Sequence, residues 1–160
     1  MTLALLLAGA IALQGVPQGR EALGVFESWG AFRDPSPLRC FAIAEPVRSR
    51  ARDPRPFASI ANWPGEGVRN QLHIRLSRQR HPRAQVTLTV GERRFELVSG
   101  ERDAWAPDPR TDAAIVSAMR GARSMSVEST GMNGRPFVDV YALQGAATAI
   151  DAAALGCVGR

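Results

Sequence analysis

The stretch that decides the fold is residues 72–98, LHIRLSRQRHPRAQVTLTVGERRFELV. Apolar and polar side chains alternate in its three runs, and the inward positions are Leu72, Ile74, Leu76, Val86, Leu88, Val90, Phe95 and Leu97. A period of two predicts strands with one buried face, and Gly91-Glu92 predicts a tight turn between the last two runs. With a further short strand ending near Trp105, this stretch predicts an antiparallel meander of four strands.

Strands are also predicted on both sides of this stretch, at residues 25–32, 38–44, 57–61, 124–129 and 136–143. A period of 3.6 predicts a helix over residues 111–121, with Thr111 as its N-cap, and a second helix over residues 143–154. The apolar face of the second helix is predicted at Leu143, Ala147, Ile150 and Ala154. The sequence therefore predicts a mainly β fold. We expect an antiparallel β-sandwich of about seven to nine strands with two short helices, one before the penultimate strand and one at the C-terminus.

The first residues have the features of an export signal. Residues 3–13 (LALLLAGAIAL) form an uncharged apolar run that is too short to span a bilayer, and Ala8, Ala10 and Ala12 within it have the spacing that a signal peptidase requires. No arginine precedes the run, although a signal peptide usually begins with positive charge. The alternative to an export signal is an ordinary buried helix. We expect a signal peptide at 1–15, a flexible segment at 16–24 and a single domain at 25–160. The predicted location is periplasmic or otherwise extracytoplasmic.

Export gives the two cysteines, Cys40 and Cys157, a role. An even pair in an oxidising compartment usually forms a disulfide, whereas in a reducing compartment two isolated cysteines are usually buried thiols. We therefore predict a Cys40–Cys157 disulfide that ties an early strand to the final segment. A bonded thiol cannot act as a standing nucleophile, so a cysteine-histidine enzyme is not expected.

Positive charge is concentrated in the middle of the chain. The formal net charge is +5, all twenty basic residues are arginine, and residues 48–84 contain nine arginines against two acidic residues. Arginine binds phosphate, sulfate and carboxylate groups in a bidentate manner. We predict contacts with a polyanion or lipopolysaccharide at Arg69, Arg75, Arg78, Arg80 and Arg83. A merely solvated surface is the alternative. No specific nucleic acid is predicted, because aromatic residues are scarce in this region.

Few residues are candidates for catalysis. Lysine is absent, which excludes Schiff-base and P-loop lysine chemistry, and no Gly-x-Ser-x-Gly motif is present. His73 and His81 have no neighbours at metal-ligand spacing, although a site that adds Asp53 or Glu66 is conceivable. Trp63 in a loop could stack on a sugar, but packing explains it equally well. We expect no enzyme, no metal and no cofactor.

Motifs at the two ends of the domain resemble a known family. They are Phe26-x-x-Trp29 followed by Cys40, Gly121-x-x-x-Met125-x-Val127, and Tyr141-Ala-Leu-Gln-Gly145-Ala-x-x-Ala149-Ile150 through Cys157. Residues 25–157 thus resemble the invasion-associated locus B family of small exported bacterial proteins. Ala142 and Ala146 replace the Ser and Phe of the family's closing motif, and the extra mid-chain cysteines of many members are lacking.

The resemblance implies a β-sandwich with a closing helix, a periplasmic or outer-surface location and no catalytic residues to carry over. We therefore expect an exported, non-enzymatic protein that binds an envelope component or a protein partner. The alternatives are a structural or stress-related envelope protein without a discrete ligand, and an uncharacterised periplasmic enzyme.

Overall fold

A computed structural model describes residues 19–49 and 53–158, so the predicted signal peptide at 1–15 lies outside the described residues. The strands are β1 (Glu21–Phe26), β2 (Trp29–Pro35), β3 (Leu38–Ala44), β4 (Phe57–Trp63), β5 (Val68–Arg75), β6 (Val86–Val90), β7 (Arg93–Ser99), β8 (Asp103–Trp105), β9 (Ser124–Thr130) and β10 (Pro136–Ala142). The helices are α1 (Pro109–Gly121), α2 (Ala146–Gly156) and the short 3-10 helix η1 (Pro64–Glu66).

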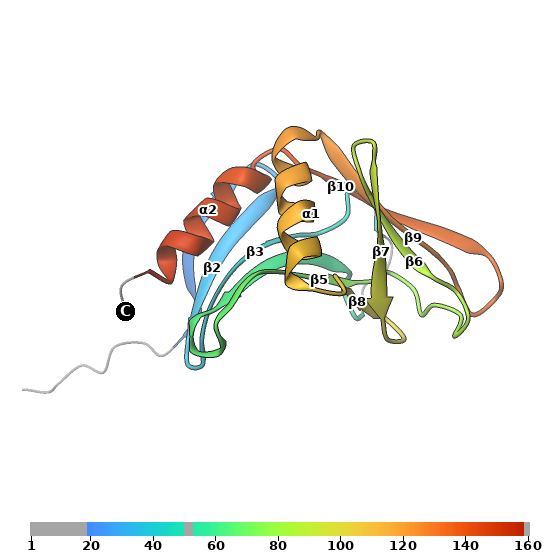
Figure 1. The fold of residues 1–160 in the computed structure, drawn as a ribbon, viewed down its shortest axis with the longest axis horizontal. Helices are drawn as coiled ribbons and strands as arrows, with labels where there is room; N and C mark the ends of the chain where they lie inside the picture. The colour runs from blue at the N-terminus through green and yellow to red at the C-terminus, as the bar shows by residue number, and fades with distance from the viewer. Residues whose placement is uncertain (1–18, 50–52, 159–160) are drawn as a thin grey trace, which may run out of the picture.

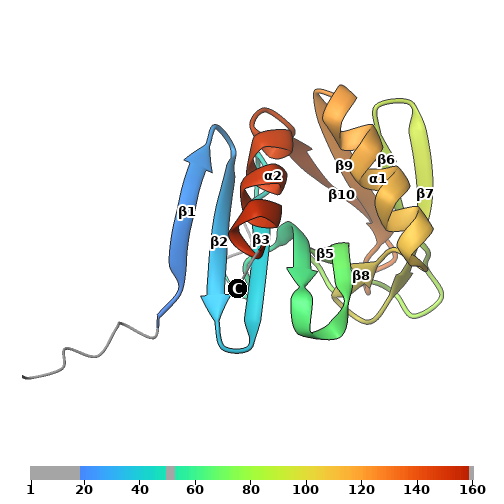
Figure 2. The ribbon, with the colours of Figure 1, turned by 60° about the vertical axis from the view of Figure 1, so that its left-hand side comes forward.

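The strands form one strongly bent antiparallel sheet. In the described part of the chain its ten strands follow the order β1-β2-β3-β4-β5-β8-β7-β6-β9-β10. One arm of the bend contains β1 to β5 and the other contains β6, β7, β9 and β10 (Figure 1). Both helices lie inside the bend, α2 against the first arm and α1 between the two arms (Figure 2). β1 and β10 are the outer strands of the sheet.

The predicted mainly β, antiparallel class with two helices is confirmed, and four details differ. Hydrogen bonds continue through β5, β8 and β7, so the two arms belong to one sheet. The strand predicted at 25–32 is two strands, because the chain turns at Glu27, which has a φ of 52°. β1 begins at Glu21, so the end of the segment predicted as flexible (16–24) belongs to a strand, ahead of the domain start predicted at Val25. Of the predicted four-strand meander, β6, β7 and β8 pair in sequence order, but β5 pairs with β8 and not with β6.

The core fills the inner side of the bend. The predicted inward positions of β5 and β6 are buried, and Ile115, Val116 and Met119 of α1 pack against them. The buried face of α2 consists of Ala146, Ala149, Ile150 and Ala153. Of the predicted stripe, Leu143 and Ile150 are buried, whereas Ala147 and Ala154 are only partly buried and the helix turns their neighbours toward the core instead.

Helix α1 begins earlier than predicted. Asp108, and not Thr111, is the N-cap: its carboxylate accepts a hydrogen bond from the Thr111 backbone N–H at 2.8 Å. Pro109 follows at the first helical position, where its missing N–H and fixed φ favour a helix start.

The predicted disulfide is confirmed. Cys40 and Cys157 are bonded, with 5.9 Å between their Cα atoms and a sequence separation of 117. The bond ties β3 to the residue that follows α2, and removing such a bond typically costs about 2–5 kcal/mol of stability. A disulfide of this kind indicates a non-cytoplasmic location. Within the described residues, neither helix is long and apolar enough to cross a membrane.

Contacts between the ends of the domain bring the first arm to β10. The indole N–H of Trp29 donates to the carbonyl of Ala142 at 2.8 Å, and the N–H of Ser28 donates to the carbonyl of Gln144 at 3.3 Å. Gly145 follows with a φ of 84°, and a Cβ at this position would overlap the Phe26 carbonyl. Only glycine therefore allows the β1–β2 turn to sit against the start of α2.

Candidate functional site

A groove lies along the free edge of β10. Its lining consists of Arg48 and Ser49 from the β3–β4 loop, Ser77 and Arg78 from the segment after β5, and residues 136–139 of β10. The volume is about 540 Å³. We call this feature the edge groove. It brings together three parts of the chain that are far apart in sequence.

Backbone contacts position the two arginines of the edge groove. The N–H of Val47 donates to the carbonyl of Val140 at 2.8 Å, which places the neighbouring Arg48 beside β10. On the other side, the N–H of Ser77 donates to a carboxylate oxygen of Asp139 at 2.9 Å. The position of Arg78 next to this bond fixes the second arginine of the groove. Both guanidinium groups are therefore held on short segments that are attached to the same strand.

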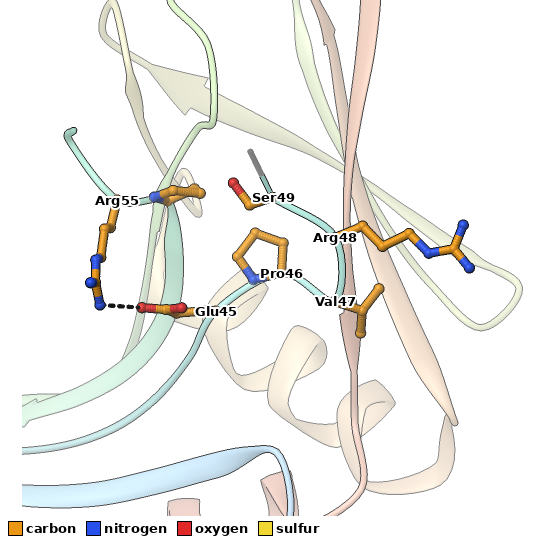
Figure 3. Close-up of a pocket in the computed structure, with 7 residues that line it drawn as sticks. Glu45, Pro46, Val47, Arg48, Ser49 and Arg55 are labelled. Atoms are coloured by element: carbon orange, nitrogen blue, oxygen red, sulfur yellow. Dashed lines mark hydrogen bonds and ion pairs between the residues drawn. The ribbon is translucent and has the colours of Figure 1, made fainter. Parts of the chain in front are cut away.

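The β3–β4 loop directs its described arginines to different sides. Arg55 pairs with Glu45, with 3.4 Å between the guanidinium nitrogen and the carboxylate oxygen. These two residues line a neighbouring cavity of about 460 Å³, to which Arg48 and Ser49 also contribute. Figure 3 shows the side chain of Arg48 extending away from the Arg55–Glu45 pair. Glu45 thus pairs with Arg55, and Arg48 has no carboxylate partner in the part of the chain that the structure describes.

The charge at the edge groove is positive on its accessible side. Neither Arg48 nor Arg78 forms an ion pair or hydrogen bond with another described residue. Asp139 is the only acidic residue in the lining, and it is 4% exposed because its side chain lies on the buried face of β10. On the same face, burial and then the charge of Asp139 raise the pKa of Tyr141. Asp139 therefore acts as an internal anchor for Ser77.

Two guanidinium groups with no carboxylate partner can hold a phosphate, sulfate or carboxylate group from another molecule. No protein-family model, curated protein or solved structure matches the chain. The chemistry of the edge groove is therefore inferred from its own side chains.

Arg80, one of the five predicted anion contacts, has a different role. Its guanidinium donates to five backbone carbonyls at 2.7–3.2 Å, those of His81, Pro82, Ala84, Ser99 and Gly100. These bonds join the loop after β5 to the turn after β7. Because they occupy most of its N–H groups, Arg80 positions the loop and is removed from the predicted anion contacts.

Arg75 is also engaged, on the outer face of the sheet. Its guanidinium Nε lies 3.1 Å from a carboxylate oxygen of Asp103, and the same oxygen lies 2.8 Å from Nε2 of His73. The imidazole of His73 stacks on Trp105, with 5.1 Å between ring centroids, and meets Phe57 edge-on. Ser59, which pairs with His73 across the strands, is buried, and its hydroxyl bonds to a backbone carbonyl. The hydroxyl that lies opposite His73 is therefore buried and already engaged.

The remaining predicted contacts lie apart from the edge groove. Arg69 lines a different groove that also contains Asp108 and Asp112, so its surroundings are not positive. Arg83 is exposed in the turn that Arg80 holds. Of the five predicted arginines, only Arg78 lines the edge groove. Arg69, Arg75, Arg80 and Arg83 are not among the residues that line this groove.

Sequence reasoning missed Arg48. It belongs to the same basic stretch, and its closeness to β10 has no local signal because it depends on the Val47–Val140 contact. Trp63 was a candidate for stacking on a sugar or for packing. It lies beneath the guanidinium of Arg39, 5.0 Å from the ring centroid. Among the described residues, no three histidine, cysteine or acidic side chains gather as a metal site requires.

Proposed function

We propose that the chain is an exported, non-enzymatic binding protein that holds an anionic group of an envelope component or protein partner in the edge groove. The observation that carries this proposal is the pair Arg48 and Arg78, which line one groove and have no acidic partner among the described residues. The Cys40–Cys157 disulfide supports a periplasmic or other extracytoplasmic location, as does the apolar run at residues 3–13. The resemblance to the invasion-associated locus B family agrees with this proposal.

Charge pairing elsewhere on the surface supports the choice of this groove. Arg20 and Arg39 both bind Asp34, Arg75 binds Asp103, and Arg94 binds Glu128. An arginine that already has a carboxylate partner loses that interaction when it binds an external anion. Arg48 and Arg78 have no such interaction to lose, so they are the more favourable contacts.

The test compares two double variants with the same change in net charge. Arg48→Glu with Arg78→Glu reverses both groove charges, and Arg69→Glu with Arg83→Glu is the matched control outside the groove. Retention of each protein on a heparin matrix is measured as the salt concentration that elutes it. We expect the groove variant to elute at clearly lower salt than the control, because polyanion contacts are sensitive to salt.

Equal elution of the two double variants would show that only net charge matters. That result would overturn the edge groove as the binding site and favour an envelope protein without a discrete ligand. Circular dichroism and thermal unfolding of both variants confirm that the fold is retained.

A further inference from the structure

The free edge of β10 is only partly covered. The carbonyl of Val140 accepts from the N–H of Val47, and the carbonyl of Ala142 accepts from the indole of Trp29. In an antiparallel pair, alternate residues direct both backbone groups toward the partner strand, and the residues between them direct both groups away. Val140 and Ala142 bond outward and are two positions apart, so Val138 directs its N–H and carbonyl away from β9 as well.

The backbone groups of Val138 have no partner among the described residues. The residue is 55% exposed and lines the edge groove, between the segments that carry Arg48 and Arg78. The groove therefore combines one backbone donor, one backbone acceptor and two cations. An unpaired strand edge of this kind is a template for the addition of another strand.

We propose that the edge groove binds an extended acidic peptide, which adds a short strand to β10 at Val138 and places its carboxylates at Arg48 and Arg78. This inference rests on the proposed function and names its partner. A peptide supplies both a carbonyl for the Val138 N–H and an N–H for the Val138 carbonyl. A fully ionised phosphate or sulfate has acceptors only and leaves that carbonyl unpaired.

A second copy of the chain fits this edge less well. Pairing β10 with another β10 would bring two copies of the same arginine-lined groove together, and like charges across an interface oppose association. A partner of opposite charge avoids this repulsion. The edge groove thus favours an acidic peptide over self-association.

The test uses a short, end-blocked, fluorescent peptide of alternating glutamate and valine, and binding is measured by fluorescence anisotropy. A second peptide has the same sequence with N-methyl groups on alternate residues, which removes the backbone donors along one edge of the extended peptide and leaves the charge unchanged; both alternate patterns are tested. We expect the N-methylated peptide to bind at least about tenfold more weakly, because backbone pairing is lost. We expect a similar loss for the protein with Arg48→Glu and Arg78→Glu, and no loss for the Arg69→Glu and Arg83→Glu control.

Val138→Pro tests the same contact from the protein side, because proline removes the outward N–H and is tolerated on edge strands. Thermal unfolding checks this variant, and the N-methylated peptide decides the question if the variant does not fold. Equal binding of the two peptides would overturn strand addition while leaving the anion-binding function intact. Absence of peptide binding together with groove-dependent heparin retention would do the same, in favour of a phosphate or sulfate ligand.

Self-association that depends on Val138 in size-exclusion chromatography would overturn the inference in favour of a second copy. Loss of both peptide binding and groove-dependent heparin retention would overturn the inference and the proposed function together.

Discussion

Arginines on two regions of this protein have opposite surroundings. On the outer face of the first arm, Arg20 and Arg39 share Asp34, and both guanidinium groups lie over the ring of Phe41 at 5.0 and 4.2 Å. In the edge groove, Arg48 and Arg78 have neither a carboxylate nor a ring partner among the described residues. The basic composition is therefore divided between arginines that stabilise the fold and arginines that are available to a partner.

The largest loss of stability is expected from a substitution of Arg80, whose guanidinium makes five hydrogen bonds to backbone carbonyls. Arg80→Ala leaves five backbone carbonyls without their charged donor and should lower the free energy of unfolding by about 2–3 kcal/mol. Urea denaturation measures this change. Arg80→Lys should recover little of it, because an ammonium group cannot reproduce the planar fork. Arg83→Ala is the matched control, and a comparable loss there would contradict the assignment.

A smaller, pH-dependent effect is expected at Asp34. The hydrogen bond from Arg20 is the main cause that holds the pKa of this carboxyl below its ordinary value of 3.8. Its stabilisation is therefore present above about pH 4 and is lost as the pH falls through the lower value of the folded state. Asp34→Asn should cost about 1 kcal/mol at neutral pH and nothing in strong acid.

Urea denaturation at several pH values measures this difference. Glu45→Gln removes an exposed pair and serves as the control, for which a change well below 1 kcal/mol is expected at any pH. A cost for Asp34→Asn that does not depend on pH would refute the charge-based explanation.

Asp103→Ala should convert a paired arginine into an open one. The variant releases Arg75 and His73 and should cost about 0.5–1 kcal/mol, because both partners are partly exposed. Its retention on heparin should rise by more than that of Glu92→Ala, which changes the net charge equally at an exposed turn. Equal retention of the two variants would mean that pairing does not control availability.

The smallest stability effect is expected in the edge groove itself. Arg48→Ala and Arg78→Ala should each change the free energy of unfolding by no more than about 0.5 kcal/mol, since neither side chain has a partner to lose. Thermal and urea unfolding provide the measurement. A loss above 1 kcal/mol for either would place that arginine among the structural ones.

The parts of this fold that depend on local pattern could be predicted from sequence. Alternation at Leu72, Ile74 and Leu76 identifies the inner face of β5, and two cysteines in a chain with an apolar leading run predict their bond. The position of β8 between β5 and β7 could not be predicted in this way. It depends on the pairing of β8 with β5, which is not its sequence neighbour, and the period of two does not specify such a pairing.

The candidate site was less predictable for the same reason. Arg78 and Arg80 are two residues apart and look equivalent in the sequence. They differ because carbonyls of the turn at Ser99 and Gly100 reach Arg80, and because Asp139 holds the segment before Arg78 on β10. Arg48 joins the site through a contact with a strand near the other end of the chain. Tertiary contacts therefore decide which arginines are open.

The disulfide also determines what a protease can achieve. Arg48 lies in the loop between β3 and β4, and the bond between Arg48 and Ser49 is one that a trypsin-like enzyme cuts, whereas Pro56 protects the bond after Arg55. Cys40 precedes this loop and Cys157 closes the chain, so the two products of a cut there remain one covalent molecule. The nicked protein separates into fragments only after reduction. A protease could therefore remodel the arginine-bearing loop without releasing either half of the domain.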